Sequence, residues 1–235
     1  YEYADPFLKW FIAQDAVNQG AAAILMSSSK ADALGIAEDK RVYIHGAGEA
    51  ADDLISLRPH LDGSWAMKTA IARALDQAGK SSADLQHFDL YSCFPCAVFS
   101  STAELGIDWK TDPRPLTLTG GLPFFGGPGN NYSLHGIAEM VSKLRANPAD
   151  FGLVLANGGW MTKEAGSSKS GLTPLIIGIR GTFRRPGPST SKTESARTIT
   201  FANMKMSWRL MANAFSSESS MCITTWTRGS CDHIE

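Results

Sequence analysis

The sequence is poor in cysteine, carries almost no net charge and contains no long apolar run. Its four cysteines are unevenly placed, which argues against a disulfide framework and favours a reducing, cytoplasmic location. The net charge of −1 gives no electrostatic reason to expect a nucleic-acid partner. No apolar stretch is long enough for a membrane span, and the first residues lack the basic start of a secretory signal. Because the chain begins with Tyr1 in place of methionine, we expect it to lie within a longer protein.

Apolar strands alternate with amphipathic helices through most of the chain. We expect strands at residues 21–27, 41–45, 88–90, 116–119 and 151–156. We expect helices at residues 7–17, 29–34, 64–78, 96–105 and 131–146. The helix at 64–78 has the clearest signals, because Ser64 can cap its start, Gly79 can end it and its apolar residues recur at helical spacing. This alternation, with uniformly apolar strands, predicts an α/β domain with a largely parallel, covered sheet.

A glycine-rich loop leads from the 116–119 strand into the 131–146 helix. It contains five glycines and two prolines between Gly120 and Gly129, and Asn130 or Asn131 can cap the helix. Such a loop directs backbone N–H groups and the positive end of the helix dipole to one point, which suits an anion or a developing oxyanion. The alternative is a tight structural turn. His135 lies one turn inside the helix, close enough to the loop to take part in binding, although a lone helix histidine is usually structural.

The run Cys93-Phe94-Pro95-Cys96 has C-x-x-C spacing where a strand meets a helix. A thiol at a helix N-terminus has a lowered pKa, so the motif raises a redox function as an alternative, and a pair of small buried apolar residues fits it equally well. Zinc is not expected, because no second pair of ligands lies nearby.

The run His45–Ala51 resembles G-x-G-x-x-A, but a nucleotide site needs an acidic residue about 20 positions further on. Trp65 stands there, so we interpret the run as a connecting loop.

Three landmarks follow expected strands, and their order and spacing resemble the C-terminal half of the thiolases. They are Tyr91-Ser92-Cys93-Phe94, Gly120–Pro128 and Ala156-Asn157-Gly158-Gly159. Two earlier runs, Asp15–Leu25 and Ala33–Ile36, look like the landmarks that precede them in the family. The resemblance covers residues 1 to about 171 and is closest to sterol-carrier-type thiolases and bacterial acetyl-CoA acetyltransferases. It implies a thiolase-like, layered α/β fold with a mostly parallel mixed sheet that is incomplete in this chain.

The resemblance also implies a division of the chain into parts. Residues 1–35 correspond to the end of the family's N-terminal domain, and residues 36–171 correspond to its C-terminal domain. The N-terminal half of a thiolase, which carries the acyl-accepting cysteine, is then the missing partner of this chain. The resemblance implies a homodimer for the full-length parent.

The substrate implied by the resemblance is an acyl-coenzyme A thioester, with no further cofactor and no metal. The implied chemistry is acyl transfer in lipid and acyl-CoA metabolism. The family's three C-terminal catalytic positions correspond here to Tyr91, Gly127 and Ala156, and all three depart from the family's residues. Because the N-terminal nucleophile is missing and neither Gly127 nor Ala156 can accept a proton, we expect this chain alone to be inactive. Thiolase-like aldolases that use tyrosine suggest that Tyr91 is an acid or an oxyanion donor.

The candidate site residues follow from these motifs. The catalytic candidates are Tyr91, Cys93 and His135, with Tyr132 as a further possible substitute near the same pocket. The candidates for substrate binding are Gly120, Gly121, Gly126, Gly127, Asn130, Asn157 and Gly158. Three other functions stay open: a non-catalytic thiolase-like subunit that binds acyl-CoA or supports a partner, an aldolase-type acyl-CoA lyase, and a C-x-x-C oxidoreductase.

The composition changes abruptly at about residue 172. Residues 172–235 contain eight basic and four acidic side chains and show little apolar periodicity. A reading frame shifted by one base permits Tyr-Ser-Thr after Leu172, which is how the family's chain continues. We therefore interpret residues 172–235 as an irregular tail that arises from a frameshift, and a basic interaction tail is the alternative. A frameshifted tail should hold little regular sheet and should not pair beside the strand that contains Leu153.

Overall fold

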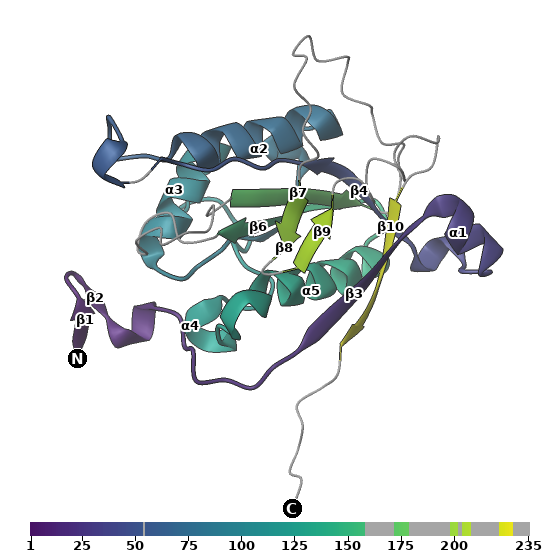
Figure 1. Cartoon of the computed structure of the whole chain (residues 1–235), viewed down its shortest axis with the longest axis horizontal. Coiled ribbons are helices and arrows are strands. Elements are labelled where there is room, and N and C mark those ends of the chain that lie inside the picture. The colour runs from purple at the N-terminus through teal and green to yellow at the C-terminus, as the bar shows by residue number, and fades with distance from the viewer. Residues whose placement is uncertain (54, 158–171, 179–197, 202–203, 208–220, 228–235) are drawn as a thin grey trace, which may run out of the picture.

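A six-stranded mixed sheet organises the fold, with helices on both of its faces (Figure 1). The computed structural model describes residues 1–53, 55–157, 172–178, 198–201, 204–207 and 221–227. The strand order is β3-β10-β4-β7-β6-β5. Their bounds are β3 Ala21–Ser27, β4 Val42–Ala47, β5 His87–Asp89, β6 Phe151–Asn157, β7 Leu172–Gly178 and β10 Met221–Thr227. Two hairpins stand apart from this sheet, β1 Glu2–Ala4 with β2 Phe7–Leu8 and β8 Thr198–Phe201 with β9 Met204–Ser207.

Four strands of the large sheet share one direction. β5 and β6 are paired in parallel, whereas β6–β7, β7–β4, β4–β10 and β10–β3 are antiparallel pairs. β3, β4, β5 and β6 therefore run the same way, and β7 and β10 are inserted between them in the opposite direction. The sheet is mixed, as the resemblance implies, and among the described strands only β5 and β6 are parallel neighbours.

The helices cover the two faces of the sheet unequally. They are α1 Ser28–Ala33, α2 Trp65–Ala78, α3 Pro95–Leu105, α4 Leu122–Phe125 and α5 Tyr132–Ala146. α2 packs on β4 and β7, and α3 packs beside α2, whereas α5 packs on β3, β6 and β10 from the other side (Figure 1). Across the described residues, every helix is too short or too polar to cross a membrane.

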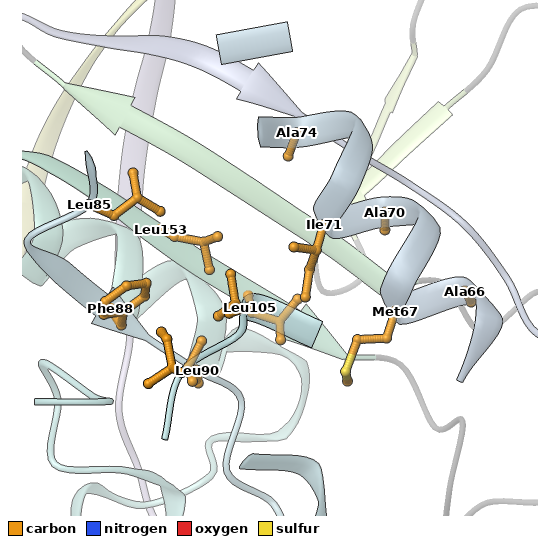
Figure 2. Packing of buried hydrophobic residues seen from close by; sticks show 12 residues of the cluster. Ala66, Met67, Ala70, Ile71, Ala74, Leu85, Phe88, Leu90, Leu105 and Leu153 are labelled. Carbon is orange, nitrogen blue, oxygen red and sulfur yellow. The ribbon is translucent and has the colours of Figure 1, made fainter. Parts of the chain in front are cut away.

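Two hydrophobic cores lie on opposite faces of the sheet, and β6 contributes to both. Leu153 and Leu155 are buried with α2 side chains such as Met67 and Ile71, in the cluster that Figure 2 shows. Val154, between them in sequence, is buried in the second cluster, which contains α5 side chains such as Val141. Because successive side chains of a strand point to opposite faces, an uninterrupted apolar strand such as β6 is suited to a covered position.

Local signals correctly predict most of the helices and strands before residue 158. Ser64 caps α2 by accepting a hydrogen bond from the Met67 N–H at 3.0 Å, and Gly79 ends the helix with a positive φ of 61°. Two predictions are wrong. Residues 7–17 form β2, a 3-10 turn at Lys9–Phe11 and an extended segment in place of a helix, and residues 116–119 form no strand. The carbonyl of Leu116 accepts a single bond from the Leu90 N–H, which is not enough to build a strand ladder.

The expectation of a tail with little regular sheet is contradicted by two of its segments. β7 pairs with β6 along seven residues, with Ile176 beside Leu153, and it also pairs with β4. β10 joins β3 to β4. A frameshifted tail should not pair beside the strand that contains Leu153, so these pairings count against the frameshift interpretation. Residues 179–197 and 208–220 lie outside the described residues.

The boundary expected at residue 35 does not separate two sheets. β3 lies before this boundary and β4 lies after it, yet β10 hydrogen-bonds to both strands. Residues on either side of the expected boundary therefore belong to one sheet in this structure.

Replacing Gly46 by alanine should destabilise the fold. Gly46 lies in β4, and an ideal Cβ there would overlap the carbonyl oxygen of Ala74 in α2. The nearest atoms to this Cβ all belong to the backbone of α2, so β4 and α2 would have to move apart. We expect the free energy of unfolding to fall by about 1–3 kcal/mol. Urea unfolding measures this difference. The matched control is Gly20→Ala, because no atom lies within 4 Å of its ideal Cβ, and equal stability of the two variants would contradict the close packing of β4 on α2.

Candidate functional site

The candidate site lies where the parallel strands β5 and β6 end. The two strands run in register, with Asp89 beside Val154. Tyr91 follows β5 by two residues, and Asn157 is the last residue of β6. The carboxyl ends of neighbouring parallel strands meet at one edge of a sheet, which is a frequent place for ligand binding in α/β folds. The structure therefore brings the first and third sequence landmarks to the same edge.

A row of aromatic rings connects two of the catalytic candidates. The Tyr91 ring packs edge-on against Tyr132, with ring centroids 5.6 Å apart. Phe125 packs against Tyr132 at 6.1 Å and against the imidazole of His135 at 5.1 Å. Tyr91 and His135 thus lie at the two ends of one aromatic cluster. The structure brings them into the same region, with two rings between them.

Beneath these rings lies a buried hydrogen-bond network. The hydroxyl of Tyr132 donates to Oδ1 of Asp89 at 3.1 Å, and it lies 2.6 Å from Oγ1 of Thr119. Thr119 also accepts a hydrogen bond from the Gly121 N–H at 3.2 Å. The network therefore joins the end of β5, the glycine loop and the first residue of α5. Sequence analysis did not select Asp89 or Thr119, although an aspartate in an otherwise apolar strand is an available signal.

Burial determines the charge state of this network. Asp89 is only 1% exposed, its Oδ2 has no hydrogen-bond partner among the described residues, and burial raises its pKa from 3.8 to about 6. Burial raises the pKa of Tyr91 to about 12 and also raises that of Tyr132. Burial lowers the pKa of His135. At neutral pH both phenols are therefore protonated and the imidazole is uncharged.

Several backbone N–H groups of the glycine loop donate hydrogen bonds to other groups of the protein. Gly121 has a φ of 89° and Gly126 a φ of 106°, conformations that favour glycine. The Gly121 N–H bonds to Thr119, the Leu122 N–H bonds to Oγ of Ser92 at 3.0 Å, and the Gly127 N–H bonds to the carbonyl of Gln14. These three donors are satisfied without a ligand. The geometry of the loop thus fits the structural-turn alternative at these positions.

An extended segment near the N-terminus lies along the same loop. The Ala13 N–H donates to the carbonyl of Cys93 at 3.1 Å, and the Gln14 N–H donates to the carbonyl of Leu122 at 3.2 Å. The side chain of Gln19 donates to the carbonyl of Phe125 at 2.8 Å. Residues 13–19 therefore form one wall of the region around α4, a role that sequence analysis did not assign to them.

The remaining candidate residues differ in their burial and in the elements that carry them. Cys93 is half-buried in the bend before α3. Gly120 is exposed with a φ of 95°, and Asn130 lies in the 3-10 turn just before α5. Oδ1 of Asn157 is buried without a hydrogen-bond partner among the described residues. Gly158 lies outside the described residues, and the described residues contain no cluster of three or more metal-ligating side chains.

The raised pKa of Asp89 predicts a specific pH dependence of stability. The folded chain holds the carboxyl proton more tightly than the unfolded chain does, so this stabilisation is complete below pH 3.8 and is lost as the pH rises through about 6. The loss amounts to up to about 3 kcal/mol. Urea unfolding at several pH values should show this decline in the wild type and a flatter profile in Asp89→Asn.

The matched control is Asp76→Asn, which removes an exposed carboxylate from α2. It should keep the decline of the wild type. The same slope in Asp89→Asn as in the wild type would show that Asp89 is not the titrating group.

Comparison with known proteins shows that this chain is similar to thiolase-like proteins. No family model matches the chain. The chain is 38% identical to a solved structure of a monomeric SCP2-thiolase-like protein type 1 from Mycobacterium smegmatis, with a TM-score of 0.64 over 75% of this chain and 37% of that one. It is 26% identical over 132 residues to a probable acetyl-CoA acetyltransferase of Mycolicibacterium smegmatis, which is 54% of this chain and 31% of that protein. The chain thus spans about a third of the length of each.

Proposed function

We propose that this chain is the C-terminal part of an acyl-CoA acyltransferase of the acetyl-CoA acetyltransferase type. The premise is its thiolase-like character. The proposed substrate is an acyl-coenzyme A thioester, and the setting is acyl-CoA metabolism in the cytoplasm. One observation carries the proposal. The protonated phenol of Tyr91 stands at the carboxyl end of β5, where the resemblance locates the group that binds the oxyanion.

The role that fits Tyr91 is that of a hydrogen-bond donor or acid. With a pKa of about 12, the phenol keeps its proton at neutral pH and cannot be the base that starts a reaction. When the carbonyl carbon of a thioester is attacked, its oxygen becomes an oxyanion. A preorganised donor in a site with little water stabilises this oxyanion more than it stabilises the neutral carbonyl. The Tyr91 ring packs against Tyr132 at an interplanar angle of 84°.

The positions of Gly127 and Ala156 supply no proton acceptor. Gly127 is buried, and an ideal Cβ there would lie 3.2 Å from Cδ2 of Leu122, so a larger side chain does not fit without repacking. The uncharged imidazole of His135 is an alternative acceptor in the aromatic cluster, because its Nε2 has no hydrogen-bond partner among the described residues. A neutral imidazole can take up a proton.

These same two positions favour a second candidate function, a non-catalytic thiolase-like subunit that binds acyl-CoA. Both proposals require a binding site for acyl-CoA, and calorimetric titration of the chain with acetyl-CoA and with coenzyme A tests for that site. Binding of acetyl-CoA that Tyr91→Phe weakens supports a site at the β5 edge. If neither compound binds, alone or after addition of a thiolase N-terminal half, the acyl-CoA proposal is wrong.

The chain alone should not catalyse thiolysis. The expected rate of acetoacetyl-CoA cleavage by coenzyme A equals the rate without protein, because the acyl-accepting cysteine of a thiolase belongs to the N-terminal half that this chain lacks, and because Gly127 and Ala156 leave no proton acceptor at the two family positions. The loss of acetoacetyl-CoA absorbance measures the rate. Turnover that is abolished by Tyr91→Phe would contradict this prediction.

In a form of the protein that turns over thioester, Tyr91→Phe should lower kcat/KM by about a hundredfold or more, since loss of one oxyanion donor typically has this effect. The decrease should exceed that of Cys93→Ala. Tyr3→Phe is the matched control, because it removes a phenol hydroxyl from the exposed ring of Tyr3 in β1. An unchanged kcat/KM in Tyr91→Phe rules out the proposed role of the phenol.

A further inference from the structure

Asp89 and Tyr132 lie beneath the candidate site and are closed off from solvent. Asp89 is the last residue of β5, two positions before Tyr91. Its exposed fraction is 1%, and that of Tyr132 is 2%, so neither side chain is open to a ligand. Anything that Asp89 contributes to the site therefore has to pass through the residues around it.

Two contacts in series lead from the Asp89 carboxyl to the Tyr91 ring. The Tyr132 hydroxyl donates a hydrogen bond to Oδ1 of Asp89 at 3.1 Å and lies 2.6 Å from Oγ1 of Thr119. The ring of Tyr132 packs edge-on against the ring of Tyr91, with centroids 5.6 Å apart. Because a phenol is rigid, a displacement of the Tyr132 hydroxyl also displaces the ring that Tyr91 contacts.

The opposite side of the Asp89 carboxyl is closely packed. An ideal Cβ at Gly136 in α5 would lie 2.9 Å from Oδ2 of Asp89 and 3.3 Å from Cγ1 of Val154 in β6. The carboxyl therefore lies against the backbone of α5, with little space to turn away from Tyr132. Close packing of this kind holds a side chain in one rotamer, so the Tyr132 hydroxyl has a fixed acceptor.

The groups around Asp89 act on its charge in opposite directions. Burial has the largest effect and raises its pKa, which the carboxylate of Glu139 on α5 raises further. Hydrogen bonds from Tyr132 and Thr119 lower it, and the outcome is a pKa of about 6. Val154, its neighbour on β6, carries no charge. Since a hydrogen bond to an ionised carboxylate is roughly twice as strong as one to a neutral carboxyl, protonation of Asp89 weakens its hold on Tyr132.

We propose that Asp89 is a positioning residue for Tyr91: its carboxylate fixes the Tyr132 hydroxyl, and the Tyr132 ring in turn fixes the place of the Tyr91 phenol. The inference rests on the proposed function, in which this phenol is the hydrogen-bond donor to the thioester oxygen. Protonation of Asp89 by solvent below about pH 6 then loosens the donor, while Tyr91 and Tyr132 both keep their own protons. The affinity of the site for an acyl thioester thus falls as the solution becomes more acidic.

NMR of the chain with ¹³C-labelled tyrosine rings tests this coupling without any ligand. The signal of Tyr91 is the one of five that is missing from Tyr91→Phe. In the wild type it should shift between about pH 7.5 and about pH 5, with a midpoint of about pH 6, although the Tyr91 phenol has a pKa of about 12 and does not titrate there. Asp89→Asn, which cannot ionise, should abolish the shift. A Tyr91 signal that stays constant in the wild type, or that shifts equally in Asp89→Asn, overturns the proposal.

Three further variants identify the titrating group and the route. The matched control Glu139→Gln removes an exposed carboxylate from α5 and should keep the shift but move its midpoint to lower pH, because the Glu139 charge raises the pKa of Asp89. His135→Gln should also keep the shift, and its loss there would assign the titration to the imidazole and overturn the proposal. Tyr132→Phe should uncouple Tyr91 from Asp89. A shift that persists in Tyr132→Phe means that Asp89 acts along the backbone, which overturns the route through Tyr132.

Calorimetric titration with acetyl-CoA over the same pH range measures the consequence for binding. Between about pH 7.5 and about pH 5, the dissociation constant should rise by about threefold more in the wild type than in Asp89→Asn. Since any titration of the ligand is common to both proteins, an equal pH dependence overturns the effect of Asp89 on the site. If acetyl-CoA does not bind at any pH, the proposed function fails, and the Tyr91 signal still decides whether Asp89 positions the phenol.

Discussion

The hydrogen bond from the Tyr132 hydroxyl to the Asp89 carboxylate holds the candidate site together. It links the first residue of α5 to the last residue of β5, deep in the interior. One turn further along α5, an ideal Cβ at Gly136 would come within 2.9 Å of Oδ2 of Asp89. The helix can approach the strand this closely because residue 136 is a glycine. Tyr132 also contacts the glycine loop through Thr119 and the ring of Tyr91.

Burial of this junction has an electrostatic cost that shapes the chemistry of the site. A carboxylate that leaves water without a full set of partners favours its neutral form, which explains the raised pKa of Asp89. The same desolvation keeps Tyr91 protonated and His135 uncharged. At neutral pH Tyr91 is therefore a neutral hydrogen-bond donor of the kind that can stabilise negative charge on a carbonyl oxygen, while Asp89, with a pKa of about 6, is mostly ionised and is held by the Tyr132 hydroxyl.

The glycine loop has the composition of an anion-binding loop, but three of its backbone N–H groups bond within the protein. Its composition indicates backbone donors free for an anion, yet the N–H groups of Gly121, Leu122 and Gly127 bond to Thr119, Ser92 and Gln14. The partner of Gly127 comes from residues 13–19, which are more than a hundred positions away in the sequence. No local pattern contains that information, because the bond exists only once the distant segment is in place.

The sequence by itself determined four of the described helices, α1, α2, α3 and α5, and the strands β3, β4, β5 and β6, because capping, glycine stops and apolar periodicity are local. Ser64 and Gly79 delimit α2, and the apolar run of residues 151–157 forms a strand. Tertiary structure alone decided which strands are neighbours, since pairing depends on segments far apart: β7 and β10 enter the sheet despite the composition of the tail. It also decided the protonation of Asp89 and Tyr91, because desolvation depends on everything packed around a group and not on its place in the chain.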